Sequence, residues 1–211
     1  IPYIILPAIF IFLEKNRSWI SAKPDELGRP GTVFTTFPFT GARKGAKGAG
    51  EVTYTAFSVP SGSLDYWMER LKKYGIPVSD ILTRFGDQLI RFEDHDSMGI
   101  ELIANDQDDR TGWSYGQVPI EHSINGFYGA TLNLRAKDLT EKLLTEHMDY
   151  HLIGEENGRF RYGTAGKPGD IVDIVIDKSG NRGVQSAGTV HHIAFRTENA
   201  ASQLQVQEIL M

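Results

Sequence analysis

Hydrophobic and polar positions alternate over two stretches of strand length, 51–59 and 126–134. Each stretch is followed by a segment in which hydrophobic residues recur at helical spacing. The alternation predicts strands with one buried face, and the spacing predicts helices with a buried stripe. In the helix expected over 62–74, the stripe consists of Leu64, Trp67, Met68 and Leu71. In the later helix it consists of Leu139, Leu143 and Leu144.

Three short strand candidates follow each predicted helix. After the first helix they cover 77–83, 88–92 and 98–103, and after the second they are YHLIG, RFRYG and DIVDIVI. The order strand, helix, three strands therefore occurs twice, and another unit begins at Gly188. The segment 106–124 is polar and rich in turn residues, and we interpret it as a linker between an N-terminal domain over 1–105 and a C-terminal domain over 125–211.

The sequence also repeats itself at a distance of 138 residues. Residues 28–60 align with residues 166–198 without a gap, and identical residues stand at nine positions, four of them glycine and one proline. Glycine and proline set backbone turns. The match therefore indicates shared backbone geometry, in which Gly45 corresponds to Gly183 and Gly50 to Gly188.

Composition narrows the classes of function. The net charge is −5, which gives no electrostatic basis for binding nucleic acid or an anionic membrane. The chain has no cysteine, which excludes disulfides, thiolate metal sites and a cysteine nucleophile, and is compatible with a cytoplasmic protein. The oligomeric state is left open, and a homo-oligomer is compatible with the sequence.

Both ends of the chain are unusual. The start is apolar from Ile1 to Leu13, but a spanning helix needs roughly 20 apolar residues, so no membrane partner is expected. The end, LQVQEILM, has the pattern of a helix interior without a cap. We therefore expect that the chain is truncated at both ends.

Four segments resemble ring-cleaving dioxygenases that act on hydroquinones. They are DELGRPGTVFTTFPF (25–39), GARKGAKGAGEV (41–52), PIEHSINGFYGATL (119–132) and GTVHHIAFRT (188–197). This group lies within the vicinal oxygen chelate superfamily, also called the glyoxalase, bleomycin-resistance and extradiol dioxygenase fold. The resemblance covers about residues 25–211, whereas residues 1–24 do not resemble the family. It implies an α+β fold of βαβββ modules paired into two domains, with the first and fourth modules incomplete.

The resemblance also implies an activity and its cofactor. The parent protein would be an extradiol-type dioxygenase that cleaves hydroquinone- or catechol-like aromatics with O₂. It would use Fe(II), with Mn(II) as the alternative metal, held by two histidines and one carboxylate.

The adjacent histidines of HHIAF are the candidate site residues. By resemblance, His192 takes the metal-ligand position, where the other modules have Tyr54 and Gly129. Neighbours on a strand point to opposite faces, so His191 is not expected to bind the same metal. It resembles a histidine near the substrate oxygens, which would act as an acid or base. From residue type alone, such a pair is more often a structural feature of a strand.

The other two ligands that the resemblance implies fall outside the sequence. The first histidine would precede Ile1, and the carboxylate would follow Met211 near position 239. Glu101 has the carboxylate position in the second module, where we interpret it as a strand-end glutamate without a metal. We therefore expect this chain alone to bind metal poorly and to be inactive.

Two other functions remain open. One is a glyoxalase-like lyase or isomerase with Zn²⁺ or Ni²⁺, and the other is a non-enzymatic module that binds a small molecule, as in bleomycin resistance. The length of the chain and the order of its motifs favour the dioxygenase. Two further motifs are interpreted as structural: EDHDS at 93–97 as a solvated turn, and the glycine-rich 41–51 as a connection, because a strand follows it where a phosphate loop needs a helix.

Overall fold

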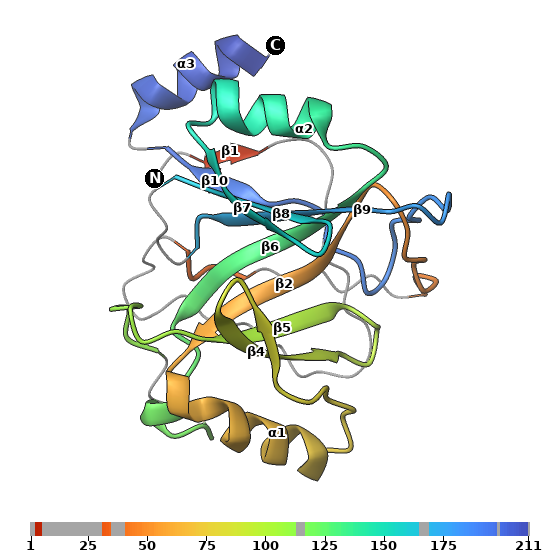
Figure 1. The fold of residues 1–211 in the computed structure, drawn as a ribbon, viewed down its shortest axis with the longest axis vertical. Helices are drawn as coiled ribbons and strands as arrows, with labels where there is room; N and C mark the ends of the chain where they lie inside the picture. The colour runs from red at the N-terminus through yellow and green to blue at the C-terminus, as the bar shows by residue number, and fades with distance from the viewer. Residues whose placement is uncertain are drawn as a thin grey trace.

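The computed structural model describes residues 3–5, 31–34, 41–112, 117–164, 169–197 and 199–210. Two units of similar build lie around one curled sheet (Figure 1). In the first unit, β2 (Glu51–Val59) leads through a single 3₁₀ turn, η1 (Ser61–Ser63), into α1 (Leu64–Lys73). Three strands complete it: β3 (Leu82–Arg84), β4 (Asp87–Glu93) and β5 (Gly99–Ala104).

The second unit repeats this order. After the 3₁₀ turn η2 (Ile120–His122), β6 (Gly126–Leu134) is followed by α2 (Asp138–Lys142), which widens into a π-helical turn, η3 (Leu143–His147). Strands β7 (His151–Glu156), β8 (Arg159–Gly163) and β9 (Ile171–Ile176) complete the unit. The β-α-β-β-β order expected from the sequence is thus present in both units.

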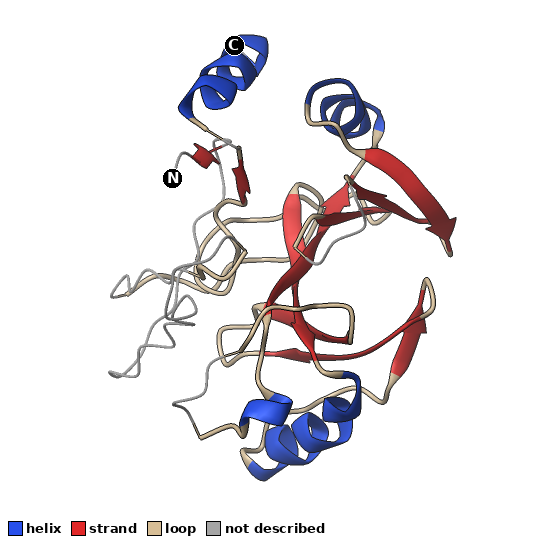
Figure 2. Cartoon of the chain, turned by 90° about the vertical axis from the view of Figure 1, so that its left-hand side faces the viewer, coloured by secondary structure: helices blue, strands red, loops and turns tan. Residues whose placement is uncertain are grey.

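All eight strands form one sheet in the order β3-β4-β5-β2-β6-β9-β8-β7. The two units meet at its centre, where β2 and β6 run antiparallel, and each of them has a parallel neighbour, β5 or β9. The sheet curls so that α1 and α2 lie on its outer side (Figure 2). This arrangement confirms the α+β fold. We call the inner side of the sheet the cup; it bears Ala56, Glu101, Thr131 and Asp173.

A separate two-stranded sheet lies away from the cup. Strand β1 (Tyr3–Ile5) pairs antiparallel with β10 (Ala194–Arg196), and α3 (Ala200–Leu210) follows. In Figure 2, β1, β10 and α3 lie on the opposite side of the central strands from the open side of the cup.

Each unit packs its helix on the outer side of the sheet. In α1, Leu64 and Leu71 are buried, and Trp67 and Met68 pack against the same core, which confirms the predicted stripe. In the second unit Leu144 is buried, but Leu139 is 85 % exposed, so the prediction that Leu139 belongs to a buried stripe was wrong. The π-helical turn explains the failure, because five residues of α-helix do not sustain the 3.6-residue period on which the stripe depends.

The segment 106–124, expected as a linker, packs on α1 where it is described. The indole Nε1 of Trp67 donates to the carbonyl of His122 at 2.9 Å, and the rings of Tyr66 and His122 stack at 4.2 Å between centroids. The units on either side of this segment share one sheet. The division into domains at 105 and 125 stays a prediction.

The two segments aligned by the 138-residue repeat lie against each other. Gly45 N donates to Ala187 O at 2.9 Å, and the corresponding Gly183 N donates to Ala49 O at 3.0 Å. A shift of 138 exchanges donor and acceptor segments, so the two bonds are related by a local two-fold axis. Part of the aligned repeat, including residues 28–30, 35–40 and 165–168, lies outside the described residues.

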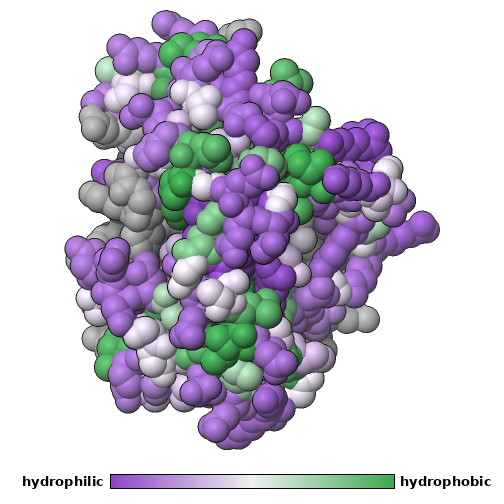
Figure 3. All heavy atoms as spheres, viewed as in Figure 1, coloured by the Kyte–Doolittle hydropathy of each residue, from purple (hydrophilic) through white to green (hydrophobic). Residues whose placement is uncertain are grey.

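Exposed hydrophobic residues are dispersed. The face in Figure 3 is mostly hydrophilic, with hydrophobic residues in separate patches. Such scattering is ordinary for a protein surface. Among the helices in the described ranges, none has the length and apolar character needed to cross a bilayer.

Candidate functional site

The histidine pair stands between two hydrophobic anchors. Val190 is buried in the core of the first unit, and Ile193 packs against that core. Two residues further on, Phe195 packs against the core of the second unit, with its ring edge-on to Tyr150 at 6.1 Å. The short backbone that carries His191 and His192 is therefore held from both sides, which limits the positions that the imidazoles can take.

Gly188 determines how this segment approaches the first unit. Its φ is +78°, and a Cβ at this position would lie 1.8 Å from the carbonyl oxygen of Asp96. Both the left-handed backbone and the close approach require glycine. The matching Gly50 also has a positive φ of +95°, but a Cβ there would meet no atom within 4 Å. The repeat thus conserves the turn, whereas only Gly188 also makes a close backbone contact.

The two imidazoles contact each other. Their Nδ1 atoms are 3.2 Å apart, so one ring donates a hydrogen bond and the other accepts it, and the rings are edge-to-face with centroids 5.4 Å apart. Burial, and then the charge of His192, lowers the pKa of His191 to about 3. His191 is therefore neutral near pH 7, the state in which imidazole can accept a proton or bind a metal.

The expected strand begins later than the sequence predicted. Residues 191–193 have no strand pairing, and β10 starts at Ala194. The argument that His191 and His192 face opposite sides of a strand therefore does not apply, and the contact between their rings contradicts it. Alternation holds only where the backbone is a regular strand.

The strand that pairs with β10 comes from the start of the chain. Tyr3 pairs with Arg196 and Ile5 with Ala194. This pairing was not expected, because residues 1–24 do not resemble the family. It brings the first strand next to the one that follows His192, as β2 lies next to β6 in the larger sheet.

A group of three potential ligands lies elsewhere. In the described part of the chain, the one group of three or more histidine, aspartate or glutamate ligand atoms within 4.8 Å of one another is Asp94, His95 and Asp96. Asp94 Oδ1 accepts hydrogen bonds from the amides of Asp96 at 3.0 Å and Met98 at 2.8 Å. Its carboxylate thus shapes the turn, as expected for EDHDS, and the group does not include His192.

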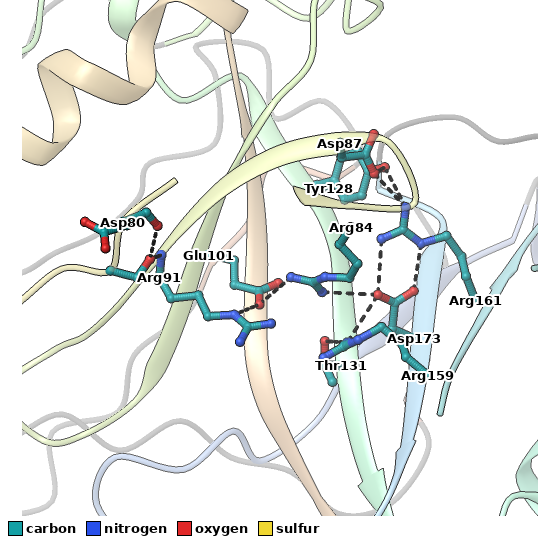
Figure 4. Close-up of polar contacts among 11 residues, drawn as sticks. Asp80, Arg84, Asp87, Arg91, Glu101, Tyr128, Thr131, Arg159, Arg161 and Asp173 are labelled. Atoms are coloured by element: carbon teal, nitrogen blue, oxygen red, sulfur yellow. Dashed lines mark hydrogen bonds and ion pairs between the residues drawn. The ribbon is translucent and has the colours of Figure 1, made fainter. Parts of the chain in front are cut away.

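Charged residues in the cup are a second polar cluster, which the sequence analysis largely missed. Glu101, expected as a strand-end glutamate, is fully buried and bonded to Arg84 at 2.6 Å and Arg91 at 2.8 Å (Figure 4). Asp173 is also buried and bonded to arginines. A usable signal was present, because a charged residue stands in the middle of the apolar stretches GIELIA and IVDIVI.

Comparison with known proteins places these features in a family. No protein-family model matches the chain. It is 38 % identical over 186 residues to the proposed ring-cleaving dioxygenase MhqO of Bacillus subtilis, covering 88 % of this chain and 59 % of that one. It is 32 % identical to a chlorohydroquinone/hydroquinone 1,2-dioxygenase of Sphingobium indicum, covering 81 % and 55 % of the two chains.

Solved structures agree with this similarity. A crystal structure of a proposed dioxygenase from Bacillus subtilis matches with a TM-score of 0.79 at 37 % identity, covering 87 % of this chain and 58 % of that one. Glyoxalase I from Zea mays matches with a TM-score of 0.52 at 11 % identity, covering 80 % and 56 %, and so shares the fold.

The chain spans 55–59 % of the length of the curated relatives that it matches. Over that part, the relatives and the fold agree with the resemblance seen in the sequence. The chain is therefore related to proteins named ring-cleaving dioxygenases and has the fold of the vicinal oxygen chelate superfamily.

Proposed function

We propose that the chain is part of an Fe(II)-dependent, extradiol-type dioxygenase that cleaves the ring of a hydroquinone- or catechol-like aromatic. The observation that carries the proposal is the similarity, over more than four fifths of this chain, to proteins named ring-cleaving dioxygenases, one of them for chlorohydroquinone and hydroquinone. Both atoms of O₂ would enter the ring-opened product.

His192 is the proposed metal ligand. A half-buried imidazole on an anchored segment is a nitrogen donor that suits Fe(II), and Mn(II) is the alternative metal. The described residues fit such a metal only in part, because they contain no group of three potential ligands that includes His192. Bound Fe(II) would supply the redox chemistry with O₂. We therefore expect the 211 residues alone to hold it weakly and to turn over poorly.

His191 is the proposed acid or base. The resemblance implies a histidine near the substrate oxygens at this position, and its ring contacts that of His192, so it would exchange a proton with a ring hydroxyl. The contact would also fix the orientation of the His192 ring, because the donor or acceptor state of one Nδ1 sets that of the other.

Location in the cytoplasm stays a prediction from the absence of cysteine.

Single histidine variants test these roles in the longest natural form of the protein, loaded with Fe(II) without oxygen. We expect His192→Ala to lose bound iron, and His191→Ala to keep iron but lose roughly 10²–10⁴-fold in kcat. His151→Ala is the control, since His151 is exposed on β7. If His192→Ala retains both iron and turnover, His192 is not a ligand.

The substrate assay distinguishes the alternatives. Uptake of O₂ with a hydroquinone supports ring cleavage. Isomerisation without O₂ uptake would support a glyoxalase-like enzyme, and binding of an aromatic without turnover would support a sequestering module.

A further inference from the structure

Two buried carboxylates occupy corresponding places in the two units. Glu101 of β5 stands beside Ala56 of β2, and Asp173 of β9 stands beside Thr131 of β6. Their strand neighbours Leu102 and Ile174 face the hydrophobic cores, so the carboxylates face the cup. Their side chains are 1 % and 3 % exposed.

Each carboxylate receives an arginine from the adjacent strand of its own unit. Arg91 stands opposite Glu101 and donates to it through Nε at 2.8 Å. Arg161 stands opposite Asp173 and donates to it through Nε at 2.9 Å. The two ion pairs are thus built in the same way, one in each unit.

Arg84 joins them. It lies at the end of β3, and its guanidinium reaches between the two units: Nη2 donates to Glu101 Oε1 at 2.6 Å and Nη1 to Asp173 Oδ2 at 3.3 Å (Figure 4). The Arg84 side chain is only 8 % exposed. It is the residue through which two acidic groups from different units share one positive charge.

The β3–β4 turn holds Arg84 in place. Phe85 has a φ of +49°, which is unfavourable for a bulky residue, and Gly86 follows with +84°. The Phe85 ring lies 4.3 Å from the Arg161 guanidinium carbon, and Asp87 bonds Arg161 at 2.6 Å. These contacts hold the strained turn, and with it the end of β3, against the second unit.

The surroundings determine which ligand could replace Arg84. Glu101 Oε2 is buried and accepts no hydrogen bond from the described residues, and Glu101 lines a cavity of about 10 Å³. A planar cation with several N–H groups could donate to both carboxylates at once. A divalent metal is disfavoured, because its double charge would stand beside the three arginines that also contact these carboxylates: Arg91, Arg159 and Arg161.

We propose that the cup is a guanidinium site whose occupant is the side chain of Arg84. The protein thus carries in its larger sheet a cation-binding site filled by its own chain. Emptied of that side chain, it should take free guanidinium from solution. The cup then acts as a fixed joint between the two units.

Chemical rescue tests this in the full 211-residue chain. Arg84→Ala should lower the melting temperature by roughly 10 °C, since it removes one charged hydrogen-bond donor from each of two buried carboxylates. Roughly 10 mM guanidinium chloride, far below denaturing levels, should raise the melting temperature of Arg84→Ala by about 3 °C or more. Sodium chloride and urea at the same concentration should not raise it. Sodium chloride supplies ions without the planar N–H groups, and urea has the planar shape without the charge. Guanidinium should also leave the melting temperatures of wild type and of Arg84→Lys unchanged, because a side-chain cation remains in both.

A second variant keeps the proposal testable if Arg84→Ala does not fold. In Arg84→Ala with Glu101→Gln, the carboxylate that needs the cation is neutral, so this chain should fold, melt above Arg84→Ala and lose the response to guanidinium. Folding of the double variant but not of the single one supports the proposal. It is overturned if guanidinium fails to stabilise or refold Arg84→Ala, or if sodium chloride or urea is equally effective.

Discussion

The imidazoles of His191 and His192 take their positions from the residues around them. Val190 and Phe195 fix the backbone in two different cores, and Gly188 allows it to pass over Asp96. The resemblance predicts that His192 is a metal ligand, and imidazole is a nitrogen donor that suits this role. Sequence alone did not reveal that the two rings touch, because that contact depends on an irregular backbone that no period predicts.

Alanine at Gly188 tests the anchoring of the pair, with Gly50 as the matched control. Gly50→Ala should cost about 1–2 kcal/mol of unfolding free energy, the penalty of a left-handed backbone for a side chain. Gly188→Ala has the same penalty and also a clash with the Asp96 carbonyl, and should cost about 1–3 kcal/mol more. Urea unfolding of both variants measures the difference. Equal losses would show that the contact with Asp96 does not restrain the segment.

At the scale of elements, the two helices differ in how they meet the sheet. Helix α1 keeps a regular stripe over ten residues, whereas α2 is five residues long before the π-helical turn. The hydrophobic period predicted both helices and the strands that follow them. It failed at Leu139, because periodicity reports the spacing of apolar residues and not whether a helix is long enough to bury them.

A pair of leucine substitutions tests the difference in burial between α1 and α2. Leu71→Ala should cost about 2–5 kcal/mol, because Leu71 is 6 % exposed and its removal leaves a cavity in the first core. Leu139→Ala should change the unfolding free energy by less than about 0.5 kcal/mol, because Leu139 is on the surface. Both are read by urea denaturation. A large loss in Leu139→Ala would mean that another part of the protein covers this residue in solution.

The polar cup contains contacts between strands that the pattern of a single strand does not predict. A charge inside an apolar stretch marks Glu101 and Asp173 as unusual, and alternation places them away from the core. The residues that neutralise them come from other strands, and Arg84 is 89 residues from Asp173. Such pairings follow from the curl of the sheet and from the junction of β2 with β6, neither of which can be read from one strand.

For the whole molecule, local two-fold symmetry is the main organising feature. It relates the two units across β2 and β6 and the two glycine-rich connections across Gly45 and Gly183. The repeat of 138 residues predicted that these connections share a backbone path. It did not predict that they lie against each other, because identity between segments says nothing about their contact. The cup between the two units is filled by Arg84, whereas β10, which follows the histidines, lies on the other side of the central strands (Figure 2).

Oxygen uptake on addition of a hydroquinone tests the central claim most directly. It is measured on the longest natural form of the protein, loaded with Fe(II), beside its His192→Ala variant and the 211-residue chain. We predict that the Fe(II) protein consumes one O₂ per hydroquinone and that ¹⁸O₂ places both labelled atoms in the ring-opened product, whereas His192→Ala and the 211-residue chain consume little. Absence of uptake by the Fe(II)-loaded protein, or undiminished uptake by His192→Ala, would contradict this account.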